Sequence, residues 1–187
     1  MLGECKYMIP KLETKKLILR GFIPEDAPIV EELAGDKRVA ETTLTIPHPY
    51  PSGSAINWIK THTERAEKQE SFIFAIEEKS KRKLIGTATL RLENSHKRAE
   101  IAYWIGFPHW GNGYATESIG KVIDFGFTFL ELNRIWATVM KKNIGSRRVL
   151  IKNGFNHEGT FSKHDFKWGN FEDVEYYGLL KEVYMKN

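Results

Sequence analysis

Two glycines, Gly111 and Gly113, stand where a run typical of a β-strand meets a long amphipathic stretch, in the string HWGNGYA. Glycine lets the backbone come close to a bound anion, and the first N–H groups of a helix have no partner within that helix. The helix dipole favours negative charge at the same end. The pattern therefore predicts that the N–H groups of residues 111–115 hold a pyrophosphate. The alternative is a glycine-assisted turn without a ligand.

Two better-known phosphate motifs are excluded. A Walker-type loop requires two glycines that flank four residues, followed by Lys and then Ser or Thr, and the chain has no such string. A dinucleotide-binding turn requires G-x-G-x-x-G, but Thr116 occupies the third glycine position. A cradle of backbone N–H groups is the remaining phosphate-binding interpretation.

A second motif, NIGSRRVLIKNGF, runs from Asn143 to Phe155. The two motifs together resemble the GNAT superfamily of acetyl-coenzyme A–dependent N-acetyltransferases, in which a Q/R-x-x-G-x-G/A loop precedes an N-x-x-S/A helix that ends in G-F. Trp110 stands at the Gln/Arg position, which departs from the general pattern. Trp110, the string AEIAYWIG and the opening LETKKLILRGF together make the chain similar to the branch of ribosomal-protein N-terminal acetyltransferases (RimJ/RimL-like). The resemblance covers nearly the whole chain.

The resemblance implies acetyl-coenzyme A as the co-substrate and assigns residues to it. The main chain of Ile105 and Phe107 is expected to contact pantetheine, with an N–H near Ile105 facing the thioester oxygen. Asn143 is expected to bind the pantetheine amides, although a helix cap is its ordinary role. Arg147 or Arg148 is expected to meet a phosphate. The pyrophosphate is expected at the turn that comprises Trp110, Gly111, Asn112, Gly113, Tyr114 and Ala115.

Acetyl transfer to an amine needs a base for the ammonium proton and a donor for the leaving thiolate. We expect Glu100 to be the base, because it matches an acidic residue of the branch. The alternatives are a charge at a strand end that faces solvent and an ion pair with Arg98 or Arg91. Many members of the superfamily use a tyrosine as the acid, and Leu150 stands at that position. Ser146, which matches the serine of the branch, is therefore expected to donate to the coenzyme sulfur. The alternative for Ser146 is a helix cap or a solvated hydroxyl.

Strands and helices are expected on both sides of these motifs. Alternating or continuous apolar residues predict strands at 14–22, 71–78, 83–93, 98–107, 134–142, 155–166 and 172–184. Apolar residues at helical spacing and end signals predict helices at 23–35, 52–70, 115–130 and 144–154, the last closed by Gly154. Tyr103 and Trp104 are assigned to the core.

This order of elements predicts an α/β (α+β) fold. The resemblance implies a GNAT-like mixed, mostly antiparallel central sheet of about seven strands with about four helices, splayed between strands 4 and 5. Residues 1–187 are expected to form a single acetyltransferase domain, since the chain has the length of one domain.

Composition limits the partners. The net charge of +4 suits a polyanionic ligand but falls short of a nucleic-acid-binding profile, and no apolar run is long enough to cross a bilayer. The one cysteine, Cys5, cannot form an internal disulfide, which favours the cytoplasm. The six histidines show no metal-ligand spacing. No nucleic acid, membrane or metal is expected as a partner, and a homo-oligomer is left open.

These expectations combine into one function. The chain is expected to transfer acetyl from acetyl-coenzyme A directly to a primary amine in a ternary complex, because Cys5 lies far in sequence from every motif. The acceptor is a protein N-terminal α-amine, such as that of a ribosomal protein, or a small-molecule amine. The alternative is a catalytically silent coenzyme A–binding or regulatory module, for which the missing tyrosine leaves room.

Overall fold

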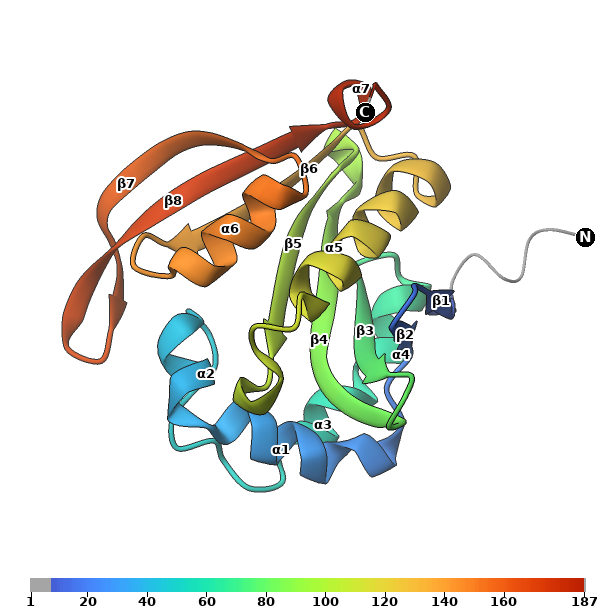
Figure 1. Cartoon of the computed structure of the whole chain (residues 1–187), viewed down its shortest axis with the longest axis vertical. Coiled ribbons are helices and arrows are strands. Elements are labelled where there is room, and N and C mark those ends of the chain that lie inside the picture. The colour runs from blue at the N-terminus through green and yellow to red at the C-terminus, as the bar shows by residue number, and fades with distance from the viewer. Residues whose placement is uncertain (1–7, 187) are drawn as a thin grey trace, which may run out of the picture.

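Eight strands form one continuous sheet in the order β1-β2-β3-β4-β5-β6-β8-β7 (Figure 1). The computed structural model describes residues 8–186. All of the predicted strands are present. The short β1 is absent from the prediction, because two residues carry no alternation. The strands are β1 (Leu12–Glu13), β2 (Leu17–Arg20), β3 (Ser71–Glu78), β4 (Lys83–Glu93), β5 (Arg98–Ile105), β6 (Arg134–Met140), β7 (Asn156–Lys167) and β8 (Asn170–Leu180).

The sheet opens between β5 and β6. Neighbouring strands are antiparallel except for these two, which run parallel and pair only over residues 98–100 and 134–136. Figure 1 shows β6, β8 and β7 fanning away from β5. The predicted splay is confirmed, and its strands are labelled β5 and β6 because β1 adds one to the count.

Helices flank the sheet. Two of them, α5 and α6, lie on one face, whereas α1, α2 and α3 lie at one end of the sheet (Figure 1). Residues 125–129 continue α5 as a turn of π-helix. The α-helices are α1 (Ala27–Gly35), α2 (Lys37–Thr42), α3 (Ser54–Lys60), α4 (His62–Glu67), α5 (Tyr114–Asp124), α6 (Ile144–Lys152) and α7 (Lys181–Tyr184).

The helices differ from the prediction in two respects. The helix predicted at 52–70 breaks into α3 and α4 at Thr61, whose hydroxyl donates to the carbonyl of Trp58 at 2.8 Å. Such a local bond competes with the helical pattern. Helices α2 and α7 are absent from the prediction, although Asp36 is a recognisable N-cap of α2 and accepts from the N–H of Arg38.

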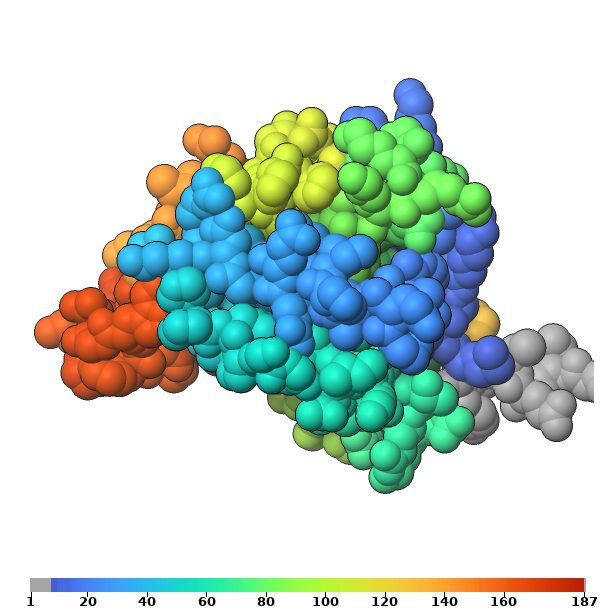
Figure 2. Space-filling view, turned by 90° about the horizontal axis from the view of Figure 1, so that it is seen from below, coloured from blue at the N-terminus to red at the C-terminus, as the bar shows by residue number. Residues whose placement is uncertain are grey.

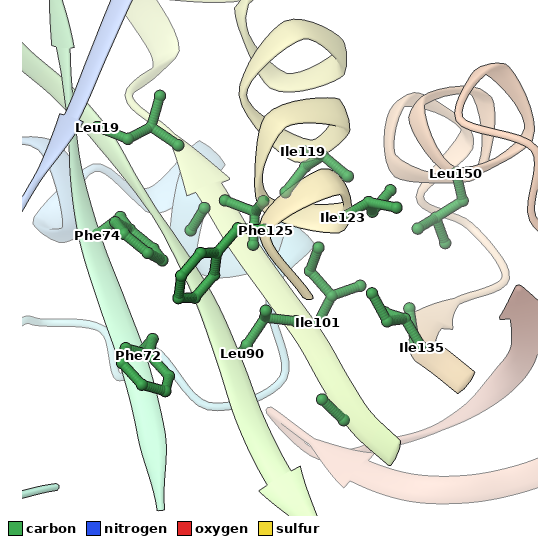
Figure 3. Packing of buried hydrophobic residues seen from close by; sticks show 14 of the residues in the cluster. Leu19, Phe72, Phe74, Leu90, Ile101, Ile119, Ile123, Phe125, Ile135 and Leu150 are labelled. Atoms are coloured by element: carbon green, nitrogen blue, oxygen red, sulfur yellow. The ribbon is translucent and has the colours of Figure 1, made fainter. Parts of the chain in front are cut away.

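A hydrophobic core joins α5 and α6 to the sheet. Figure 3 shows Ile119 and Ile123 of α5 packed towards Ile101 and Leu90 of the sheet, with Leu150 of α6 in the same cluster. These side chains are at most 2% exposed, and burial of each contributes about 1.5–3 kcal/mol. The core therefore fixes β5 relative to α5, which is the junction that carries the two glycines.

The end of α6 follows the prediction. Gly154 has a left-handed φ of 84°, and its N–H donates to the carbonyl of Ile151 at 3.0 Å. The N–H of Phe155 donates to the carbonyl of Leu150 at 3.1 Å, and both side chains are buried. This pair of bonds is a Schellman motif. The Gly-Phe pair that closes the second sequence motif therefore has a structural role.

Candidate active site

A cavity of about 1020 Å³ lies where β5 and β6 diverge. Its walls come from β4, β5 and β6, from the first turns of α5 and α6, and from the segment 42–47 between α2 and α3. Most of the predicted site residues line it, whereas Phe107 and Asn112 do not. The predicted residues in the lining are Glu100, Ile105, Trp110, Gly111, Gly113, Tyr114, Ala115, Asn143, Ser146 and Arg148.

The glycine turn presents open backbone to this cavity. Gly111 and Gly113 have left-handed φ angles of 79° and 78°, and a Cβ on either would meet no atom within 4 Å. Among residues 8–186, no acceptor is paired with the N–H groups of residues 111–116. Three of these N–H groups belong to the first turn of α5, which is positively polarised. The geometry therefore fits the pyrophosphate of coenzyme A.

Side chains of the turn stabilise its shape. The indole of Trp110 donates to the carbonyl of Ile105 at 2.6 Å and packs edge-on against Phe107. The amide of Asn112 donates back to the carbonyls of His109 and Trp110. The hydroxyl of Tyr114 donates to a carboxylate at the end of β3, that of Glu78. The side chains of this turn thus form bonds within the protein, and its main-chain N–H groups are what remains for a ligand.

Strand β5 turns one edge towards the gap. The N–H of Gly106 donates to Ile85 in β4, so the alternate residues Tyr103 and Ile105 present their main chain to the other side, where β6 no longer pairs. Ile105 lies about 16 Å from Glu100 at roughly 3.3 Å per residue. An acetyl group bound at the Ile105 N–H would therefore lie at the far end of this stretch from Glu100. The N–H of Tyr103, on the same edge of β5, lies closer to Glu100.

Glu100 lies on the sheet face opposite to α5, next to Ala102 and Trp104 in the alternation of β5. Its Oε2 accepts from Nη1 of Arg91 at 2.7 Å, and its side chain is 22% exposed. Its Oε1 has no partner among the described residues. The ion pair with Arg91 that the sequence left open is thus present. One carboxylate oxygen remains available within the cavity.

Ser146 has a partner that sequence reasoning missed. Its Oγ lies 2.8 Å from the hydroxyl of Tyr103, which also donates to the Ser146 carbonyl at 3.2 Å. Burial raises the pKa of Tyr103, so this phenol stays protonated near neutral pH. Leu150 is fully buried in the core. Ser146 and Tyr103 therefore place two hydroxyls in contact with each other at the cavity wall near the start of α6.

Asn143 caps α6 and also reaches across the cavity. Its Oδ1 accepts from the N–H of Ser146 at 3.0 Å, as an N-cap does, and its Nδ2 donates to the carbonyl of Thr42 at 2.9 Å. The nearby Lys167 donates to the carbonyl of Thr43. These two bonds attach the segment 42–47 to α6 and β7. Figure 2 shows this cyan segment beside the red hairpin of β7 and β8.

The two arginines of α6 have different surroundings. Arg147 pairs with the buried carboxylate of Glu175 at 2.8 Å and does not line the cavity. Arg148 lines the cavity and has no ion-pair partner among the described residues. Arg148 is therefore the better placed of the two to meet a phosphate.

Two other kinds of site are absent from residues 8–186. No three His, Cys, Asp or Glu side chains come together there as a metal ion would require. Among the same residues, none of the helices is both long and apolar enough to span a bilayer. Cys5 lies outside the described residues.

Known proteins are similar to this chain in sequence and in fold. The family model for an acetyltransferase (GNAT) domain matches residues 16–156. The uncharacterized N-acetyltransferase YoaA of Bacillus subtilis is 34% identical over 175 residues, which cover 93% of this chain and 98% of the relative. The ribosomal-protein-serine acetyltransferase of Escherichia coli is 31% identical over 98 residues, which cover 52% of this chain and 55% of the relative. The spermidine N-acetyltransferase of Vibrio cholerae, solved with CoA and spermine, superposes with a TM-score of 0.80 at 24% identity, over 92% of this chain and 99% of that one.

Proposed function

Because the chain belongs to the acetyltransferase (GNAT) family and is an acetyl-coenzyme A–dependent N-acetyltransferase, we propose that it transfers acetyl directly to a primary amine within a ternary complex. The resemblance found in the sequence is thereby confirmed at the level of the family. The named relatives act on different acceptors, a ribosomal protein in one case and spermidine in another. An amine is what these acceptors have in common.

The observation that carries the proposal is the open backbone at residues 111–116. Among residues 8–186 these N–H groups have no acceptor, and they lie at the start of an 11-residue helix next to two glycines in the left-handed region. This arrangement would bind a diphosphate. Arg148 adds a positive charge at the same cavity. From this turn, the pantetheine arm would run along the open edge of β5, past Ile105 towards Tyr103.

The chemistry would take place near the middle of β5. Acetyl-coenzyme A supplies the acetyl group as a thioester. The free Oε1 of Glu100 would accept the proton of the acceptor ammonium, directly or through a water. The N–H of Tyr103 would donate to the oxygen that becomes negatively charged. The Ser146 hydroxyl would donate to the departing sulfur, and the phenol of Tyr103 would hold the Ser146 hydroxyl in place.

Release of free thiol from acetyl-coenzyme A tests the proposal. With a panel of peptides and small amines, at least one acceptor should raise the rate above hydrolysis, and initial-rate plots should intersect as for a ternary complex. Parallel plots would indicate an acyl-enzyme instead. If coenzyme A binds while no amine raises the rate, the catalytically silent binding module is correct.

Substitution of Glu100 tests the base. Glu100→Gln should lower kcat by about 10²- to 10⁴-fold, because general base catalysis is lost, with the coenzyme A affinity unchanged. Glu93→Gln is the control, since Glu93 pairs with Arg98 on the neighbouring strand and does not line the cavity. A Glu100→Gln enzyme with the wild-type rate and pH–rate profile would remove Glu100 from the mechanism.

A further inference from the structure

The charges of the cavity restrict the acceptor. Among the described residues that line it, the sole carboxylate is that of Glu100, whereas four side chains are cationic: Arg91, Lys142, Arg148 and Lys152. A polyamine carries several positive charges, and each needs a carboxylate nearby to offset its loss of water. One carboxylate, already shared with an arginine, cannot serve them. The acceptor should therefore carry a single ammonium group.

Arg91 and Glu100 present opposite charges side by side to the cavity. They are direct cross-strand neighbours on β4 and β5, and one N–H of the guanidinium is used in their 2.7 Å contact. The Arg91 side chain is 49% exposed, and no other partner of its guanidinium is found among the described residues. It can therefore bind an anion with the remaining donors, for which the planar fork suits a carboxylate. Glu100 retains Oε1 for an ammonium.

Beyond this charged pair the cavity has aromatic and aliphatic walls, with Thr87 and Thr89 of β4 beside them. On β5 the alternation leads from Glu100 to Ala102 and then Trp104, and Trp58 of α3 lies in the same cluster as Trp104. The facing segment adds Leu44 and Ile46 to the lining. An apolar side chain of the acceptor would find aromatic and aliphatic walls here.

The same segment forms a fixed wall of the cavity. Residues 42–47 all line it, and bonds from Asn143 to Thr42 and from Lys167 to Thr43 attach the segment to α6 and β7. In a peptide the free carboxylate lies at least one residue further from the α-amine. The side-by-side pair of Arg91 and Glu100 therefore fits a free amino acid better than a peptide.

We infer that the acceptor is a free α-amino acid with an apolar side chain, its ammonium bound by Glu100 and its carboxylate by Arg91. This inference rests on the proposed function and adds the substrate class. In the reaction, the ammonium first loses one proton to Glu100, the amino nitrogen then forms a bond to the acetyl carbon, and the carbon–sulfur bond breaks. The nitrogen loses a second proton as the amide forms, which balances the proton that the thiolate takes from Ser146. The products are an N-acetyl amino acid and coenzyme A.

The test compares acceptors that differ in one charged group. Purified full-length enzyme and acetyl-coenzyme A are assayed for thiol release with leucine, phenylalanine and tryptophan, with their carboxamides, with a tripeptide and with spermidine. The free acids should be preferred over the carboxamides by about 10- to 100-fold in kcat/KM, as for loss of a charged hydrogen-bonding partner. Equal or better rates with the carboxamides, the tripeptide or spermidine would overturn the inference.

Variants of two arginines separate recognition from folding. Arg91→Gln should abolish the preference by raising KM for the free acids at least tenfold more than KM for the carboxamides, because only the free acids lose an ionic partner. Arg98→Gln is the matched control, because Arg98 pairs with Glu93 outside the cavity lining and should leave the preference intact. Retained preference in Arg91→Gln would contradict the inference. If no amine at all is acetylated, the proposed function fails, which is a different result from acetylation of spermidine alone.

Discussion

At the residue scale, the hydroxyl of Ser146 is held by a side chain from another element. Tyr103 of β5 and Ser146 of α6 meet at 2.8 Å although 43 residues separate them in the chain. The buried phenol stays protonated, and its one hydrogen can go either to the Ser146 carbonyl or to Ser146 Oγ. When it goes to Oγ, the serine hydrogen is left for the cavity. Tyr103 is thus a positioning residue for Ser146 in the proposed mechanism.

Removal of the phenolic oxygen tests this pair. Tyr103→Phe should lower kcat by about tenfold with KM for acetyl-coenzyme A unchanged, because one hydrogen bond to the donor is lost. Ser146→Ala should show a loss of similar size. The double variant should be no slower than the slower single variant, since both changes interrupt one path.

Steady-state kinetics of the three variants measure the coupling. Tyr176→Phe is the control, because Tyr176 stacks on Trp136 outside the cavity lining and should retain the wild-type rate. Losses that multiply in the double variant would show that Tyr103 and Ser146 act independently.

Some of these site residues could be predicted from the sequence, and others could not. Glu100 and Ser146 belong to recognisable local patterns, so both could be named before the structure was known. Tyr103 could not, because a tyrosine in an apolar strand is ordinarily a core residue and its partner is distant in sequence. The ion pair of Glu100 with Arg91 depended on strand register, which leaves Arg91 and Arg98 equally plausible until β4 and β5 are aligned.

At the scale of elements, the strand–turn–helix unit of β5 and α5 is the part that the sequence predicted best. Its signals are local: an apolar strand, two glycines and a helical period, all in consecutive residues. The structure adds the left-handed φ angles and the unpartnered N–H groups. The break at Thr61 and the short β1 were harder, because single hydrogen bonds and two-residue runs leave little periodic signal.

A side chain at Gly113 tests the cradle. Gly113→Val should weaken coenzyme A binding by at least 100-fold, because the added groups extend into the space before the free N–H groups and valine strains a φ of 78°. Calorimetric titration with coenzyme A measures the change. An affinity equal to that of the wild type would exclude the turn as the diphosphate site.

Gly53→Val is the matched control for backbone strain. Gly53 precedes α3 as Gly113 precedes α5, with a φ of 75° and no atom within 4 Å of an added Cβ. It should lower the melting temperature to a similar extent while the affinity for coenzyme A is retained. A loss of affinity in both variants would point to strain and not to the cradle.

At the scale of the whole molecule, one buried histidine links folding to pH. His62 is 3% exposed and packs edge-on against Trp58 and Phe22, and neither ring nitrogen has a hydrogen-bond partner among the described residues. Burial, and secondarily the charge of Arg65, lowers the pKa of His62 to about 4 from its ordinary 6.5. The folded protein therefore keeps this ring neutral.

The sign of the pH dependence follows. Below pH 6.5 the unfolded chain binds a proton at His62 and the folded chain does not, so the free energy of unfolding should fall between about pH 6.5 and 4. The fall from this group should reach about 3 kcal/mol. Urea titrations at several pH values should show that His62→Leu removes this part of the slope, whereas His96→Gln at an exposed position retains it. An unchanged slope in His62→Leu would contradict the assignment.

Long-range contacts are also what the sequence could not predict about the cavity. The bonds that hold the segment 42–47 join residues separated by 101 and 124 positions, and no local pattern specifies them. The stretch 45–54, which overlaps it, contains Pro47, Pro49 and Pro51 and has neither a helical nor a strand period. The position of the segment 42–47 across from β5 arises from the packing of the entire sheet.

Strand β5 meets the two proposed substrates on different sides of its own backbone. The coenzyme arm would lie along the edge left bare by β6, and the amine would stand on the broad surface that carries Glu100. Because these approaches do not cross, neither molecule obstructs the route of the other. In the proposed ternary complex we therefore expect that either substrate can bind first, and that spent coenzyme can leave while the acetylated product is still bound.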